Sequence, residues 1–129
     1  MTRNGRRSRR LVVDDQVFLW SLSHTHQALG GGRYQDCCEV LQLRLSRSPG
    51  RLRITFRAGP GRSLPDGLGP SGLVGTGPDT LNLHRPGSAR ALLDEARARG
   101  WRPDSPLPEE TDGWPLLTAI TTRRRQSPA

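Results

Sequence analysis

Three segments between residues 17 and 57 alternate between apolar and polar side chains, and this pattern constrains the fold more than any other feature. A period of two is typical of strands that bury one face. The apolar positions are Phe18, Trp20, Leu22, Leu41, Leu43, Leu45, Leu52, Ile54 and Phe56. One antiparallel register, with Phe18 opposite Leu45, aligns all apolar residues of the first two segments, whereas a one-residue slip aligns none. We therefore expect an antiparallel sheet with one apolar face.

The turns between these segments set the rest of the expected sheet. Residues 48–50, a Ser-Pro-Gly sequence, favour a turn between the last two segments. The facing pairs are then Leu45 and Leu52, Leu43 and Ile54, and Leu41 and Phe56. A two-residue turn at residues 14–15 would pair Leu11 with Phe18 and so add an edge strand. Three successive glycines at residues 30–32 predict a wider loop.

One helix is predicted from Pro86 to the residues before Gly100. Proline is favoured at a first helical position and glycine just beyond a helix end. Ala89, Leu92, Leu93 and Ala96 form the apolar stripe of this segment. Trp101 is placed to fold back on the last turn in a Schellman motif, and Glu95 precedes Arg99 at the spacing of a helical ion pair. This stripe is the sizeable apolar helical face expected to cover the sheet.

The remaining segments are predicted to be irregular or short. Residues 58–80 contain seven glycines and four prolines and predict a long loop. Residues 80–84 are a short strand candidate, and residues 102–113 read as a polar connection. Trp114, Leu116, Leu117 and Ile120 indicate a last short element. The expected fold class is α+β, an antiparallel sheet of four to five strands with one main helix packed on one face, in a single domain over residues 10–120.

The formal net charge of +8 lies at the two ends of the chain. Five arginines in residues 1–10 and three in residues 121–129 are not balanced by acidic residues, whereas twelve arginines in between match twelve acidic residues. We interpret residues 1–9 and 121–129 as basic, disordered, solvated tails. The alternative interpretation is that these arginine-rich tails bind a nucleic acid or another polyanion.

The same composition bears on the cellular location. The short apolar run at residues 11–13 is stopped by Asp14 and Asp15, so we expect no secretory signal. We expect no membrane partner, because no stretch approaches the about 18 apolar residues of a spanning segment. Two adjacent cysteines without a distant partner fit a reducing compartment. The expected location is cytoplasmic.

A polar cluster is predicted at one end of the apolar sheet face. The register places His24 opposite Glu39 and His26 opposite Cys37, and His84 could join them. Such side chains can hold zinc, or a Glu-oriented His can act as a general base. Cys37 could also be a nucleophile activated by His26. We favour the simpler reading as polar residues where the core meets solvent, because paired Cys-x-x-Cys spacing is absent, and we expect no cofactor.

Two further features concern anionic ligands. Residues 67–72 match the pattern G-x-G-x-x-G, but the glycines and proline at 75–78 exclude the helix that a dinucleotide site requires. The sheet face opposite the core carries Arg44, Arg53 and Arg57, beside Ser21, Gln42 and Thr55. These arginines are candidate anion-binding residues. The aromatic residues fall on the other face, which disfavours base stacking.

Three segments resemble small uncharacterised proteins of high-GC Gram-positive bacteria. They are FRAGPGR at residues 56–62, LNLHRPG at residues 81–87 and ALLDEARARGW at residues 91–101. The resemblance covers about residues 10–120 and implies a bacterial cytosolic origin. It carries no activity that could be transferred to this chain.

The leading functional hypothesis is a non-enzymatic binding or interaction domain, with a protein partner or a small ligand and with loop 58–80 as the expected contact region. Two alternatives remain open at this point. One is a nucleic-acid-associated protein that acts through its arginine-rich tails. The other is a small metal-dependent enzyme that uses His24, His26, Cys37 and Glu39.

Overall fold

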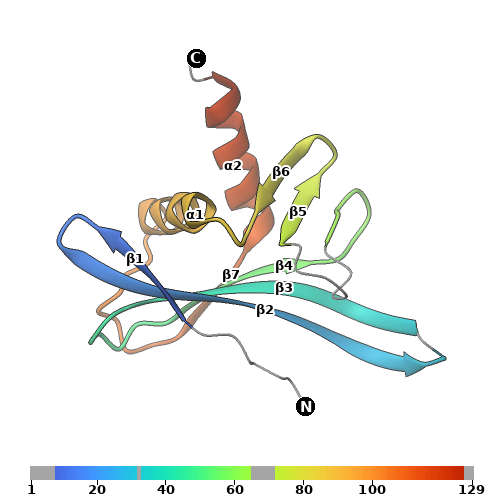
Figure 1. The fold of residues 1–129 in the computed structure, drawn as a ribbon, viewed down its shortest axis with the longest axis horizontal. Helices are drawn as coiled ribbons and strands as arrows, with labels where there is room; N and C mark the ends of the chain where they lie inside the picture. The colour runs from blue at the N-terminus through green and yellow to red at the C-terminus, as the bar shows by residue number, and fades with distance from the viewer. Residues whose placement is uncertain (1–7, 32, 65–71, 127–129) are drawn as a thin grey trace.

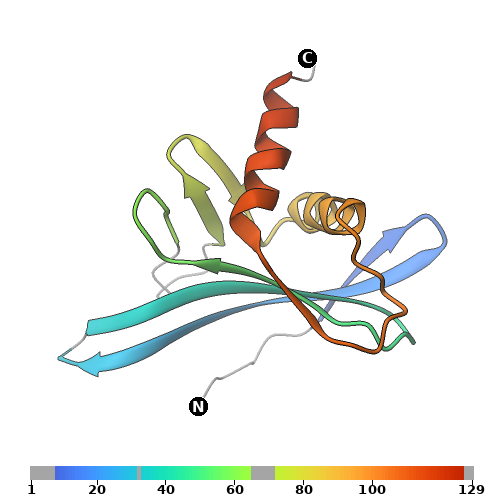
Figure 2. The same ribbon diagram turned by 180° about the vertical axis from the view of Figure 1, so that it is seen from behind.

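Two helices and a small hairpin lie on one face of a five-stranded sheet (Figures 1 and 2). The computed structural model of the chain describes residues 8–31, 33–64 and 72–126, and of residues 26–28 and 33–36 it describes the backbone alone. The elements are β1 (Arg9–Val13), β2 (Gln16–Gly30), β3 (Arg33–Leu45), β4 (Leu52–Arg57), β5 (Leu73–Thr76), β6 (Asp79–Asn82), α1 (Pro86–Ala98), β7 (Glu109–Asp112) and α2 (Gly113–Gln126).

The α+β class and the mostly antiparallel sheet are confirmed. The strand order is β1-β2-β3-β4-β7, and β5 and β6 form a separate two-stranded sheet. Two helices are present in the described residues where one main helix was expected. The predicted polar connection over residues 102–113 is wrong at its end, because residues 109–112 form β7, which pairs with β4 in parallel. Its polar sequence, EETD, carries no apolar alternation that would predict a strand.

The predicted register of the first three strands is confirmed. Phe18 lies opposite Leu45, Trp20 opposite Leu43, and Leu11 opposite Phe18. The turn between β1 and β2 places Asp14 at a φ of 55°, a conformation that short acidic side chains tolerate. The wide loop expected at residues 30–32 is wrong, because β2 continues to Gly30 and β3 begins at Arg33. The two strands extend beyond β1 and β4 as a two-stranded arm (Figure 1).

The predicted register between β3 and β4 is wrong by two residues. The observed pairs are Leu43 with Leu52, Leu41 with Ile54, and Glu39 with Phe56. The connection is longer than a tight turn because its backbone is tied to other segments. The Ser46 N–H donates to the Val17 carbonyl at 2.9 Å, and the Gly50 N–H donates to the Pro103 carbonyl at 2.9 Å. A shift of two keeps every apolar residue on the core face, since the side-chain period is also two.

The predicted helix and its C-terminal cap are confirmed. α1 begins at Pro86, and Gly100 follows its end at a φ of 110°. The Trp101 N–H donates to the Ala96 carbonyl at 3.0 Å, and the Gly100 N–H donates to the Arg97 carbonyl at 3.0 Å, which is the Schellman arrangement. The buried stripe of α1 joins the core residues of the sheet.

The long loop predicted over residues 58–80 is interrupted by regular structure. Residues 73–76 and 79–82 pair as the β5–β6 hairpin, and Gly77 begins its turn at a φ of 69°. The strand expected at residues 80–84 therefore lies at 79–82. The hairpin is tied to the preceding loop, because the Ser63 N–H donates to the Gly75 carbonyl at 2.8 Å. Residues 65–71 lie outside the described part of the chain.

The last predicted element is a longer helix than expected. α2 runs from residue 113 to residue 126, so residues 121–126 are helical rather than part of a disordered tail. The helix starts at Gly113, where a Cβ atom would lie 2.5 Å from the Phe56 ring. Its C-terminal arginines contact acidic partners, Arg123 with Glu95 and Arg125 with Asp79. At the other end of the chain, Arg9 belongs to β1, and residues 1–7 lie outside the described residues.

Glu95 joins the two helices, and its protonation is expected to control part of the stability. Its side chain is 9% exposed, and its carboxylate accepts hydrogen bonds from Arg99 at 2.8 Å and Arg123 at 2.7 Å. The Arg99 hydrogen bond lowers the pKa of Glu95, burial opposes this shift, and Arg123 adds to the lowering. A carboxyl with a lowered pKa stabilises the fold above its unfolded pKa of about 4.3, and this contribution is lost as the pH falls through the folded pKa.

We therefore expect Glu95→Gln to be less stable than the unchanged chain at pH 7. The difference should shrink as the pH falls toward 3, because the native carboxyl is then neutral too. Urea titrations at several pH values measure this difference. A difference that stays constant with pH would contradict the role assigned to the Glu95 charge.

Candidate anion-binding site

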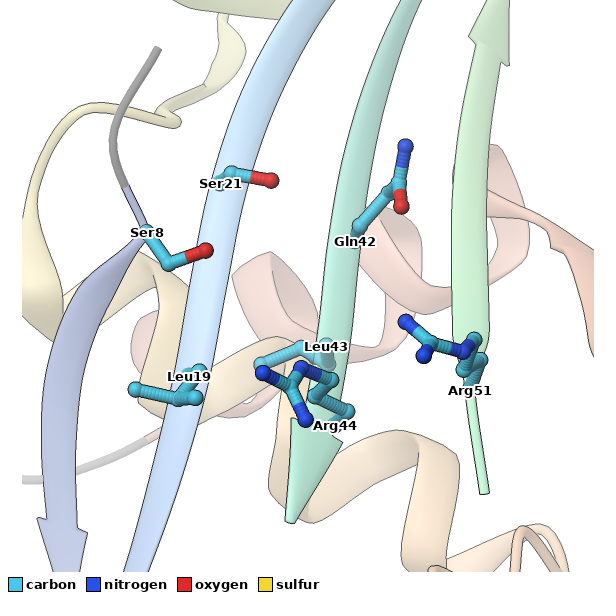
Figure 3. Close-up of a pocket in the computed structure, with 7 residues that line it drawn as sticks. All are labelled: Ser8, Leu19, Ser21, Gln42, Leu43, Arg44 and Arg51. Carbon is cyan, nitrogen blue, oxygen red and sulfur yellow. The ribbon is translucent and has the colours of Figure 1, made fainter. Parts of the chain in front are cut away.

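We call the sheet face that lies opposite the helices the open face. A polar hollow lies on this face. Cross-strand pairing places Leu19 beside Arg44 and Ser21 beside Gln42. Arg51 immediately precedes β4, and Ser8 immediately precedes β1. The hollow is lined by Ser8, Leu19, Ser21, Gln42, Arg44 and Arg51, and by Leu43, whose side chain lies on the core face (Figure 3).

The hollow is small and its polar groups point into the space above β2 and β3. Figure 3 shows the guanidinium of Arg51 extended toward β3 and that of Arg44 extended toward β2. The Ser21 hydroxyl points toward β3 in the same view. The volume is about 160 Å³, below the roughly 300–1,000 Å³ of sites that enclose a whole drug-sized ligand. The hollow is therefore sized for one charged group of a larger molecule.

The arginines of the open face differ in whether an acidic side chain lies beside them. Arg53 and Arg57 approach the Glu110 carboxylate of β7 at 3.6 and 3.7 Å. The Thr55 hydroxyl also donates to Glu110, at 3.0 Å. Among the described residues, the ion pairs of the open face do not include Arg44 or Arg51. The predicted trio is thus divided, because Arg53 and Arg57 contact Glu110 whereas Arg44 lies in the hollow with Arg51.

The lining residues offer donors suited to an oxyanion. A guanidinium presents up to five N–H donors in a planar fork, which matches carboxylate and phosphate oxygens. The Gln42 amide and the Ser21 hydroxyl add neutral donors beside that charge. Arginine side chains stay protonated in proteins and do not serve as general bases. The hollow is therefore equipped for binding and positioning an anion.

The polar cluster predicted on the core face is brought together only in part. His24 lies opposite Glu39 as predicted, and its Nδ1 makes a hydrogen bond with Glu39 Oε1. Glu39 is 3% exposed. This pair lies beside the core residue Phe56, which faces Glu39 from β4. The pair lies in the wall of the core, with Glu39 buried and His24 partly buried.

The other members of that cluster are placed differently. The register shifts between Thr25 and Gln27, which face Cys38 and Gln35, so the predicted pairing of His26 with Cys37 falls at a β-bulge. The His26 side chain lies outside the described residues. Neither Cys37 nor Cys38 forms a disulfide among the described residues.

His84 lies between β6 and α1, where its carbonyl accepts a hydrogen bond from Arg9 at 2.6 Å. Among the described residues no three His, Cys, Asp or Glu side chains gather as a metal site. The zinc site and the Cys37 nucleophile stay predictions.

Sequence reasoning missed Arg51 and Ser8 as members of the open-face hollow. The alternation of residues 51–57 does place Arg51 on the same face as Arg53. The signal that was missing is Glu110, which lies on a strand that the sequence does not predict and which neutralises Arg53 and Arg57. The contact with Glu110 distinguishes Arg53 and Arg57 from the two arginines of the hollow, which are available to bind an anion.

Comparison of the chain with protein-family models, with curated proteins and with solved structures finds no match. In the part of the chain that the structure describes, no helix is long and apolar enough to cross a membrane.

Proposed function

We propose that this protein is a non-enzymatic binding domain that holds an anionic group, a phosphate or a carboxylate, in the open-face hollow. The observation that carries the proposal is the contrast between neighbouring arginines. Arg44 and Arg51 share one hollow without an acidic partner among the described residues, whereas Arg53 is close to Glu110. Two like charges in one hollow repel each other, and a bound anion relieves that repulsion.

The chemistry of the lining supports binding rather than catalysis. Its polar side chains are two serines, one glutamine and two arginines. None of these types is itself a ready general base at neutral pH, and a serine nucleophile needs an adjacent base to activate it. On the core face, His24 and Glu39 make a hydrogen bond with each other beside the core.

The arginines outside the sheet favour this site over the terminal segments as the anion contact. Arg123 and Arg125 of α2 contact Glu95 and Asp79, so part of the C-terminal positive charge is neutralised within the fold. The hollow, in contrast, keeps two arginines for an external partner. A nucleic acid that binds through the terminal arginines is the competing proposal, and the variants below distinguish the two.

We expect calorimetric titration at low salt to detect binding of pyrophosphate, citrate or both, and the two probes separate phosphate from carboxylate recognition. Arg44→Ala and Arg51→Ala should each weaken binding about tenfold or more, because each removes charge-assisted hydrogen bonds of roughly 1.5–3 kcal/mol. The matched control is Arg53→Ala on the same face, which should change the affinity by less than about twofold.

Three outcomes would contradict the proposal. Equal losses in Arg44→Ala and Arg53→Ala would indicate a general electrostatic effect rather than a site. Undiminished binding in Arg44→Ala and Arg51→Ala would place the anion elsewhere, with the terminal arginines as the next candidates. Absence of binding to both probes by the unchanged chain would remove the anion site altogether.

A further inference from the structure

In the part of the chain that the structure describes, no further strand pairs with either edge of the five-stranded sheet, and the two edges carry charges of opposite sign. Among the described strands, β1 has β2 as its one neighbour and β7 has β4. β1 has the sequence RRLVV, with two basic residues and no acidic residue, and β7 has the sequence EETD, with three acidic residues and no basic residue. An open edge presents unpaired backbone N–H and C=O groups to any strand that can approach it.

We propose that β1 of one copy of this chain pairs with β7 of a second copy and so extends the sheet from molecule to molecule. This interaction is independent of the anion site, which lies on the open face rather than at an edge. The occupant of each edge is thus the opposite edge of an identical chain.

The strand directions fit this pairing. From β1 to β4, each strand is antiparallel to its neighbour in the sheet. β7 is parallel to β4. β1 and β7 therefore run in opposite directions within one sheet. When a second copy is added with its helices on the same side, its β1 lies antiparallel to β7 of the first, and antiparallel ladders are slightly more stable than parallel ones.

One register of this pairing joins complementary side chains. Arg10 lies on the open face, since it pairs with Leu19, and Glu110 lies on the same face, since it pairs with Arg53. Placing Arg10 opposite Glu110 also places Val12 opposite Pro108. Val12 is 62% exposed in the single chain, so the pairing would cover an apolar side chain that the fold leaves in water.

The charge that remains available at each edge favours the same contact. Arg9 is engaged within its own chain, with its guanidinium 4.5 Å from the Trp20 ring centroid and a hydrogen bond to His84. Arg10 and Glu109 have no ion pair among the described residues. Glu110 is 49% exposed and contacts its arginines at 3.6 and 3.7 Å, so its carboxylate can accept a further donor.

Edge charge also selects against the symmetric alternatives. Pairing of β1 with β1 would bring arginines together, and pairing of β7 with β7 would bring carboxylates together. Pairing of β1 with β7 joins opposite charges. Such a head-to-tail contact does not close on itself in a dimer, so association should grow with protein concentration.

Sedimentation velocity of the full chain tests this proposal in two ways. The unchanged chain should form species larger than a dimer as its concentration rises, and added salt should dissociate them through screening of the edge charges. Arg10→Glu alters one edge and Glu109→Arg the other, and each should weaken self-association about tenfold or more. In an equimolar mixture, the unchanged β1 of Glu109→Arg can pair with the unchanged β7 of Arg10→Glu. The mixture should therefore form dimers and no larger species, because the two remaining edges of each dimer are the altered ones.

The contrary results are equally specific. A monomer at all concentrations, or association that salt does not weaken, would overturn the proposal. Strong association of Glu109→Arg alone would indicate a β1–β1 contact, and strong association of Arg10→Glu alone would indicate a β7–β7 contact. A mixture no larger than its separate components would also exclude the complementary edges. Arg90→Glu, on the exposed face of α1, is the control and should associate like the unchanged chain.

Discussion

Leu43→Ala is expected to lower the free energy of unfolding by about 2–5 kcal/mol. Leu43 is 1% exposed and lies in the middle of the sheet, where Trp20 faces it from β2 and Leu52 from β4. Removing its side chain leaves a cavity among Trp20, Leu52 and the other core side chains, and the hydrogen-bonded strands that carry these residues cannot move together to fill it. Urea titration monitored by tryptophan fluorescence measures the change.

Arg53→Ala is the matched control on the opposite face of the same sheet. Its side chain is half exposed, and its contact with Glu110 is a surface ion pair, so we expect a change within about 0.5 kcal/mol. Equal effects of the two substitutions would contradict the assignment of core and open faces. A folded Arg53→Ala variant also serves as the control for anion binding.

His24→Leu is expected to destabilise the fold by about 3–5 kcal/mol, because it removes a partner from a buried carboxylate. Glu39 is almost inaccessible and makes a hydrogen bond with His24. Urea titration at pH 7 measures the loss.

The companion measurement is a double-mutant cycle. Glu39→Met added to His24→Leu should recover part of the loss, since an apolar pair of similar volume leaves no buried charge. Additive losses in the two substitutions would contradict a structural pairing of these side chains. They would return attention to the metal and general-base hypotheses for His24.

The parts of the fold that could be predicted are those with a local cause. Phe18 and Trp20 find their partners on β3 because one register aligns all three apolar residues of each segment. α1 begins at Pro86 and is followed by Gly100 because these residues have strong preferences at helix ends. Both signals lie within a few tens of residues of sequence.

The parts that could not be predicted depend on contacts between distant residues. The register between β3 and β4 is set by a connection whose Gly50 N–H is bound to Pro103, which follows α1. The sequence of residues 121–126 is typical of a solvated tail. Its helical structure depends on contacts such as the ion pair between Arg123 of α2 and Glu95 of α1. β7 has no apolar alternation, so its pairing with β4 is visible only in the fold.

The same distinction applies to the candidate site. The face of Arg44 follows from alternation in residues 40–45, and that of Arg51 follows from alternation in residues 51–57. Their availability does not follow from either pattern, because it depends on Glu110 reaching Arg53 and Arg57 instead. Charge that is formally balanced over residues 11–120 is therefore unevenly distributed on the surface.

The location of a bound anion tests the central claim most directly. NMR spectra of the labelled full chain during titration with pyrophosphate, including the side-chain N–H signals of arginine and glutamine, report which residues change. The account predicts saturable shifts at Ser21, Gln42, Arg44 and Arg51 and small changes at Arg53 and Arg57. Shifts concentrated at His24 and Glu39, or at Arg123–Arg125 with Arg44 and Arg51 unchanged, would contradict it.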